Sequence, residues 1–105
     1  MSVSQSAEII LSPAALDHIA AFKARQRRTI LDEIELQLAH EPTLVTQQRK
    51  PMRPNPLASW ELRIGQFRVY YQVEHDQPDQ ATVYIIAVGI KIRDRIMIGG
   101  KEVKL

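Results

Sequence analysis

A change in the spacing of apolar residues constrains the fold of this 105-residue chain more than any other feature. Over residues 60–73, apolar and polar residues alternate, as in strands that bury one face. Gly65 and Gln66 interrupt the alternation, and a glycine-first pair suits the tight turn of a hairpin. Residues 14–38 instead repeat their apolar side chains at helical spacing. The sequence therefore predicts helices in the first half of the chain and strands in the second.

The helical half follows a short apolar strand. That strand starts near Val3, and Ser12 with the proline after it ends the strand and provides a helix cap. The basic stretch 25–28 divides the helical pattern in two, which predicts a helical hairpin. Because Pro42 cannot continue a helix, we expect the second helix to end near His40.

The remaining segments are a long connection, a further strand and a short tail. Residues 41–58 contain four prolines and no regular period, which predicts an extended or irregular connection. Connections of this length tend to be functional or disordered. The nearly continuous apolar character of residues 81–88 favours a central strand, and residues 101–105 are predicted to form a last short strand or a docking segment.

The composition excludes several classes of protein. Hydrophobic residues make up 45% of the chain and charged residues 25%, which is typical of a folded protein, and we expect residues 1–105 to form a single domain. The chain has no cysteine and its three histidines lack metal-ligand spacing, so we expect no metal and no other cofactor. The absence of a membrane-length apolar run and of a secretion signal predicts a cytoplasmic protein without a membrane partner.

The positive charge of the chain is small but clustered. The formal net charge is +2 at pH 7, whereas basic residues gather in three stretches, at 23–28, 49–53 and 91–95. Any one stretch fits an ordinary solvated surface. Three together favour a surface that binds a polyanion.

The predicted hairpin places two arginines side by side. With a two-residue turn, Arg63 faces Arg68 and Glu61 faces Tyr70, all on one side of the sheet. The planar guanidinium groups suit a bidentate contact with phosphate. Alternatively, the arginines form a surface pair that Glu61 neutralises. Tyr70 either stacks on a nucleic acid base or simply packs.

The order of these elements and two stretches of sequence resemble the RelE/ParE toxin superfamily over nearly the whole chain. The stretches are Trp60-Glu-Leu-Arg-Ile-Gly-Gln-Phe-Arg-Val-Tyr-Tyr-Gln-Val73 and Val83-Tyr-Ile-Ile-Ala-Val-Gly-Ile-Lys-Ile-Arg-Asp-Arg95. The resemblance implies an α+β fold in which an N-terminal strand and a helical hairpin pack on a mainly antiparallel β-sheet. It also implies the toxin of a type II toxin–antitoxin system, with a cognate antitoxin protein as its partner.

RelE-like members of the superfamily cleave ribosome-bound mRNA with a set of basic residues. By this resemblance, Arg63, Arg68 and Lys91 are the catalytic candidates of a metal-independent endoribonuclease that inhibits translation. The 2′-hydroxyl of the RNA would attack the adjacent phosphate while the protein holds the strand. The candidates for binding the substrate are Arg49, Lys50, Tyr70 and Arg93.

Two departures from the RelE-like pattern leave other activities open. Glu61 occupies a position where the best-known ribonucleases of the family have a second lysine, and Met97 lies near the position of their C-terminal tyrosine. Because an arginine is a poor proton acceptor, no general base is assigned. The alternatives are a ParE-like inhibitor of DNA gyrase without nuclease activity, and a degenerate member that only binds its antitoxin.

Overall fold

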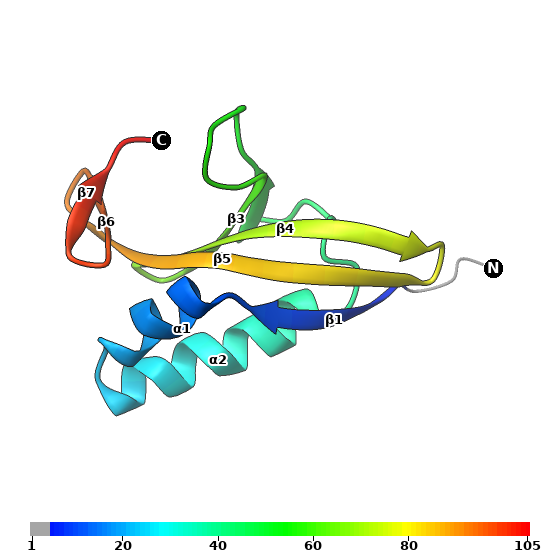
Figure 1. The fold of residues 1–105 in the computed structure, drawn as a ribbon, viewed down its shortest axis with the longest axis horizontal. Helices are drawn as coiled ribbons and strands as arrows, with labels where there is room; N and C mark the ends of the chain where they lie inside the picture. Colours follow the sequence, from blue (N-terminus) through cyan, green and yellow to red (C-terminus); the bar gives the residue numbers. More distant parts are fainter. Residues whose placement is uncertain (1–4) are drawn as a thin grey trace.

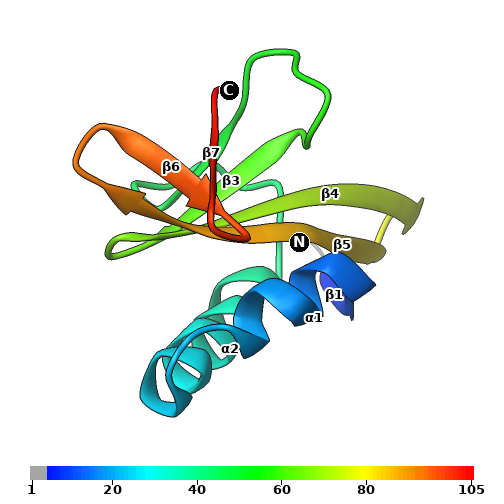
Figure 2. The same cartoon turned by 60° about the vertical axis from the view of Figure 1, so that its left-hand side comes forward.

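The computed structural model describes residues 5–105, which form two helices and seven strands. Figures 1 and 2 show both helices on one face of the sheet, and the connection between β2 and β3 on the other. The predicted start of the first strand near Val3 lies outside the described residues. In chain order the elements are β1 (Ser6–Leu11), α1 (Pro13–Ala20), α2 (Ala24–Leu38), β2 (Arg49–Pro51), β3 (Trp60–Ile64), β4 (Phe67–Gln77), β5 (Gln80–Ile92), β6 (Arg95–Ile98) and β7 (Lys101–Val103).

The strands form one mainly antiparallel sheet. Strands β2 to β7 follow one another in chain order, and β1 pairs with β5 in parallel. The first half of β5 lies between β1 and β4, and its second half lies between β4 and β6. The predicted α+β fold is confirmed, and so is the central place of the strand predicted over residues 81–88.

The helical hairpin forms where the sequence predicts it. The Ser12 hydroxyl accepts a hydrogen bond from the backbone N–H of Ala15 at 3.0 Å and thereby caps α1. The second helix, α2, ends at Leu38, close to the predicted end. Burial of one apolar face of each helix drives the packing against the sheet. The buried helical residues are Ala15, Ile19, Ile30, Ile34 and Leu38.

The hairpin of β3 and β4 has the predicted register. Arg63 lies opposite Arg68, and Glu61 lies opposite Tyr70. Gly65 takes a positive φ of 57° in the turn, which a glycine adopts without strain. The sequence thus determines which side chains of this hairpin lie on the face away from the helices.

Two short strands were not predicted. Strand β2 lies within the connection 41–58 and pairs with β3, and β6 follows β5 after a tight turn. Neither stretch is long enough to show the alternation that indicates a strand. Each takes its conformation from pairing with a neighbouring strand, which the local pattern does not reveal. Strand β7 confirms the predicted last short strand. Among residues 5–105, neither helix combines the length and the apolar character needed to cross a membrane.

Both faces of the sheet carry apolar clusters. The larger cluster lies under the two helices. A smaller cluster on the other face surrounds Tyr70, with Ala58 and Ala87 buried beside it and Leu57 and Ile96 packed against it. The β2–β3 connection and β6 therefore fold over the second face, and the space between them holds the candidate site.

Candidate functional site

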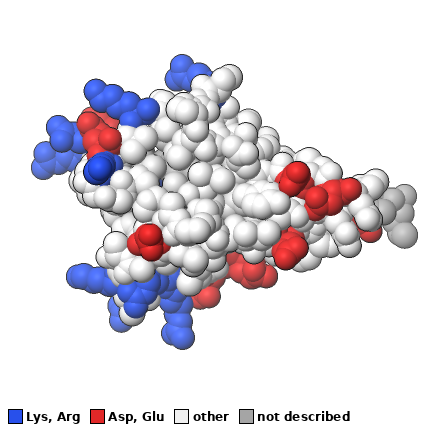
Figure 3. Space-filling model, viewed as in Figure 1, with Lys and Arg blue, Asp and Glu red and all other residues white. Residues whose placement is uncertain are grey.

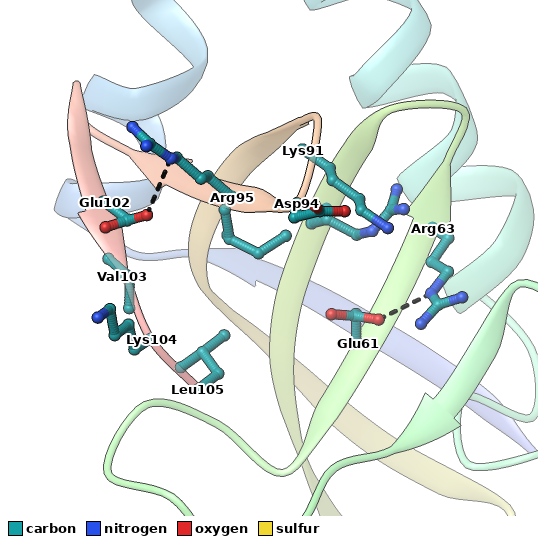
Figure 4. Close-up of a pocket in the computed structure, with 11 residues that line it drawn as sticks. Glu61, Arg63, Lys91, Asp94, Arg95, Glu102, Val103, Lys104 and Leu105 are labelled. Atoms are coloured by element: carbon teal, nitrogen blue, oxygen red, sulfur yellow. Dashed lines mark hydrogen bonds and ion pairs between the residues drawn. The ribbon is translucent and has the colours of Figure 1, made fainter.

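Two adjoining pockets form one groove on the face of the sheet opposite the helices. The first pocket has a volume of about 470 Å³ and the second about 350 Å³, and both are lined by Glu61, Arg63 and Leu105. The groove runs between the β2–β3 connection and the chain from β6 to Leu105 (Figure 4). Seven basic and three acidic side chains line it: Lys50, Arg53, Arg63, Arg68, Lys91, Arg95 and Lys104, with Glu61, Asp94 and Glu102.

Arg63 is held by an ion pair on its own strand. Its Nε donates to Oε1 of Glu61 at 2.9 Å. The predicted neutralising role of Glu61 is therefore present. The ion pair uses only Nε, and the terminal nitrogens of Arg63 make no hydrogen bond within residues 5–105. Both terminal nitrogens of this guanidinium group, with four N–H donors, thus remain available to a ligand in the groove.

Arg68 is almost buried, with 8% of its surface exposed. Its Nη1 donates to the carbonyls of Gly65 at 2.7 Å and Phe67 at 2.9 Å, which fixes the guanidinium group beside the hairpin turn. Within residues 5–105, no carboxylate lies within ion-pairing distance of Arg68 or Lys91. A cation that is mostly removed from water and lacks a carboxylate partner favours the binding of an anion.

Lys91 reaches the same pocket from the end of β5. Its backbone N–H donates to the Gln66 carbonyl at 2.7 Å, which joins the end of β5 to the hairpin turn. Figure 4 shows the Lys91 side chain extending towards Arg63, over the pocket that Glu61 also lines. The three predicted catalytic side chains therefore line one pocket, from three neighbouring strands.

Gly89 explains the Val-Gly pair of the sequence motif. It lies opposite Arg68 on one side and Ile98 on the other. A Cβ atom at this position would lie 2.6 Å from the carbonyl oxygen of Met97 and 2.7 Å from a side-chain carbon of Ile98. Only glycine therefore allows β6 to cross so close to β5, and this crossing forms one wall of the groove.

Two of the predicted substrate-binding residues are buried and are corrected to structural roles. Arg49 is 6% exposed, and its Nη1 donates to the carbonyls of Gln37 at 2.8 Å and Glu41 at 2.9 Å. It thus satisfies carbonyls at the end of α2, where a positive charge is favourable. Tyr70 has no exposed surface and lies at the centre of the smaller apolar cluster, so it cannot stack on a base.

The other two predicted substrate-binding residues are exposed. Lys50 lines the second pocket and lies opposite Glu61 across β2 and β3. Arg93 lies in the turn between β5 and β6, with a φ of 58°, and lines neither pocket. The site prediction did not include Arg95, which pairs with Glu102 at 3.5 Å, or Lys104. Arg95 belongs to the basic stretch 91–95, but no sequence signal indicates Lys104.

Charge is distributed unevenly over the molecule. In Figure 3, lysines and arginines gather at the end that carries β6 and β7 and at the α1–α2 turn, and acidic residues lie towards the far ends of β4 and β5. Within residues 5–105, no group of three or more His, Cys, Asp or Glu side chains could hold a metal ion.

The sequence matches a known family over most of its length. The sequence model described as the ParE toxin of the type II toxin–antitoxin system parDE matches residues 9–95. The chain belongs to this family of toxins. The resemblance to the RelE/ParE superfamily predicted from the sequence is thereby confirmed.

Solved structures agree on the fold. The toxin–antitoxin complex RelBE2 from Mycobacterium tuberculosis contains a chain of 19% identity and TM-score 0.66, with 87% of this chain and 95% of that chain covered. The YoeB/ParE toxin from Agrobacterium tumefaciens has 16% identity and a TM-score of 0.61, with 81% of this chain and 99% of that chain covered. No curated protein sequence matches the chain.

Proposed function

We propose that this ParE-family toxin binds RNA in the groove and cleaves mRNA on the ribosome. One observation carries the proposal: Arg63, Arg68 and Lys91 line the same pocket, and within residues 5–105 the last two have no carboxylate partner. The phosphate gains negative charge when the 2′-hydroxyl attacks it. Fixed cations stabilise that charge at little reorganisation cost.

The length of the groove supports a strand of RNA as its ligand. The first pocket holds one set of cations, and the second continues it with Lys50 and Arg53. Successive phosphates of one strand would each meet a basic side chain. Binding of this kind weakens steeply as the salt concentration rises.

A cognate antitoxin is the proposed protein partner. The matched family is described as the toxin of a type II toxin–antitoxin system, and one of the similar structures is a toxin–antitoxin complex. An antitoxin that covered the groove would keep RNA from reaching its basic side chains. We propose that the antitoxin blocks access to the groove, either directly or through the adjoining β6 and β7.

A second candidate function is inhibition of DNA gyrase without nuclease chemistry. The ion pair between Glu61 and Arg63 favours this reading, because it places a carboxylate in the groove, where it repels RNA. A protein that only binds gyrase does not need free cations at a single phosphate. The nuclease therefore requires the charges of Arg63 and Lys91 at the phosphate, whereas the gyrase inhibitor does not.

Two assays with the purified toxin distinguish the nuclease from the gyrase inhibitor. The chain is incubated with mRNA-programmed ribosomes, and in parallel with gyrase and relaxed plasmid. The variants Arg63→Gln and Lys91→Gln each remove one exposed cation from the groove, whereas Arg68 is left intact because its hydrogen bonds support the hairpin turn. The control Lys101→Gln removes an exposed charge from β7 outside both pockets.

We expect the wild-type chain and Lys101→Gln to cleave the mRNA, and each groove variant to lose about 10²-fold or more in rate. Supercoiling by gyrase should be unaffected. Intact mRNA together with inhibited supercoiling would instead establish the gyrase inhibitor.

A further inference from the structure

Glu61 is the acidic residue shared by the two pockets of the groove. Only 13% of its side chain is exposed. Lys50 lies opposite it on β2, Tyr70 lies opposite it on β4, and Arg63 follows on the same strand. A carboxylate at the centre of a basic groove weakens the attraction of RNA. Its presence there needs a chemical reason.

The ion pair with Arg63 fixes the orientation of this carboxylate. Oε1 of Glu61 accepts the hydrogen bond from Nε of Arg63, and the carboxylate lies close enough to the Tyr70 hydroxyl to raise the pKa of that hydroxyl. Figure 4 shows one carboxylate oxygen turned towards Arg63 and the other turned away from it. Oε2 is therefore oriented by the ion pair, and as a carboxylate oxygen it can accept a proton.

The other groups around the pocket are less suited to this task. Arginine and lysine side chains are protonated near neutral pH and cannot accept a proton. Burial, and the negative charge of Glu61, raise the pKa of Tyr70 above its ordinary value, so its hydroxyl stays protonated. Glu102 lies on the opposite wall, where it pairs with Arg95 at 3.5 Å. Asp94 lies exposed in the β5–β6 turn, and no ion pair within residues 5–105 fixes its carboxylate.

We propose that Glu61 is the general base of RNA cleavage, an inference that rests on the proposed function. The proton of the 2′-hydroxyl passes to Oε2 of Glu61 as the 2′-oxygen forms its bond to phosphorus. The bond between phosphorus and the 5′-oxygen breaks, the leaving oxygen takes a proton from water, and the resulting hydroxide takes up the proton held by Glu61. The products are a 2′,3′-cyclic phosphate and a 5′-hydroxyl. Arg63, Arg68 and Lys91 stabilise the charge on the phosphate during this step.

The variant Glu61→Gln distinguishes two roles of Glu61: a general base, and a negative charge that only repels RNA. The glutamine oxygen can still accept the hydrogen bond of Arg63, but the amide cannot take up a proton at neutral pH. If Glu61 is the base, cleavage slows by about 10²- to 10⁴-fold, although RNA binds equally well or more tightly. If Glu61 only repels RNA, the same substitution speeds cleavage.

Glu74→Gln is the matched control, because it removes the same charge from an exposed position of β4 outside both pockets of the groove. The measurement is single-turnover cleavage of mRNA on ribosomes at saturating toxin, with RNA affinity measured separately. We expect the control to cleave within a few-fold of the wild-type rate. Glu61→Asp retains a carboxylate and should recover part of the rate lost in Glu61→Gln.

The possible outcomes distinguish this inference from the proposed function. If the wild-type chain cleaves no RNA, the proposed function fails and the inference fails with it. If the wild-type chain cleaves RNA and folded Glu61→Gln cleaves it as fast or faster, only the assignment of Glu61 is overturned. Should Glu61→Gln fail to fold, Glu61→Ala replaces it: a folded Glu61→Ala that cleaves at the wild-type rate overturns the assignment, and one that is slowed by about 10²-fold or more, with Glu61→Asp faster than it, supports the assignment.

Discussion

At the scale of single residues, two adjacent tyrosines show what determines the cost of burial. Tyr70 and Tyr71 have no exposed surface and point to opposite faces of the sheet. The hydroxyl of Tyr71 donates to the Pro42 carbonyl at 2.9 Å, whereas the hydroxyl of Tyr70 has no hydrogen-bond partner within residues 5–105. A buried polar group without a partner destabilises the folded state.

Substitution of each tyrosine by phenylalanine tests this difference. Tyr71→Phe leaves the Pro42 carbonyl unpaired, and we expect the free energy of unfolding to fall by about 1–3 kcal/mol. Tyr70→Phe leaves no carbonyl unpaired and removes a buried hydroxyl that makes no well-formed hydrogen bond, so stability should stay the same or rise. Urea denaturation of both variants measures the two values. A larger loss for Tyr70→Phe than for Tyr71→Phe would contradict this account.

The same two positions show how far residue patterns predict a site. Alternation along β3 and β4 correctly placed Arg63, Arg68, Glu61 and Tyr70 on one face. It could not show that the β2–β3 connection and β6 cover part of that face, because these segments carry no clear period. Of the two roles left open for Tyr70, stacking on a base or packing, the structure shows packing under this cover.

At the scale of elements, the crossing of β6 over β5 shapes the groove. Gly89 allows the close approach, and the turn that follows brings Lys91 and Arg95 to the first pocket. The hairpin of β3 and β4 could be predicted, because its turn and its alternation agree. Strands β2 and β6 could not, because each is short and takes its conformation from the strand beside it.

Two glycine substitutions test the importance of this crossing. The Cβ atom in Gly89→Ala would press against the backbone of Met97, and we expect a loss of up to about 3 kcal/mol in the free energy of unfolding, with slower RNA cleavage. Gly65→Ala is the control: its Cβ meets nothing within 4 Å, and its positive φ costs only about 1 kcal/mol. A greater loss of stability in Gly65→Ala would contradict the role given to Gly89.

At the scale of the whole molecule, basic residues gather at one end and acidic residues at the other, so the toxin has an electrostatic dipole. The groove lies at the end where basic residues gather, and the far ends of β4 and β5 are acidic (Figure 3). Such a field attracts and orients a polyanion before contact, even though the net charge is only +2. The composition alone could not predict this arrangement, because it depends on which basic stretches the fold brings together.

Mapping of transcript ends after induced expression in a bacterium tests the central claim, that the basic groove cleaves mRNA, most directly. Wild-type toxin should give codon-phased cuts in translated messages, and these cuts should disappear in Lys91→Gln, which changes only an exposed side chain of the groove. Growth arrest by the wild-type chain with intact messages, or equal cutting by Lys91→Gln, would contradict the account.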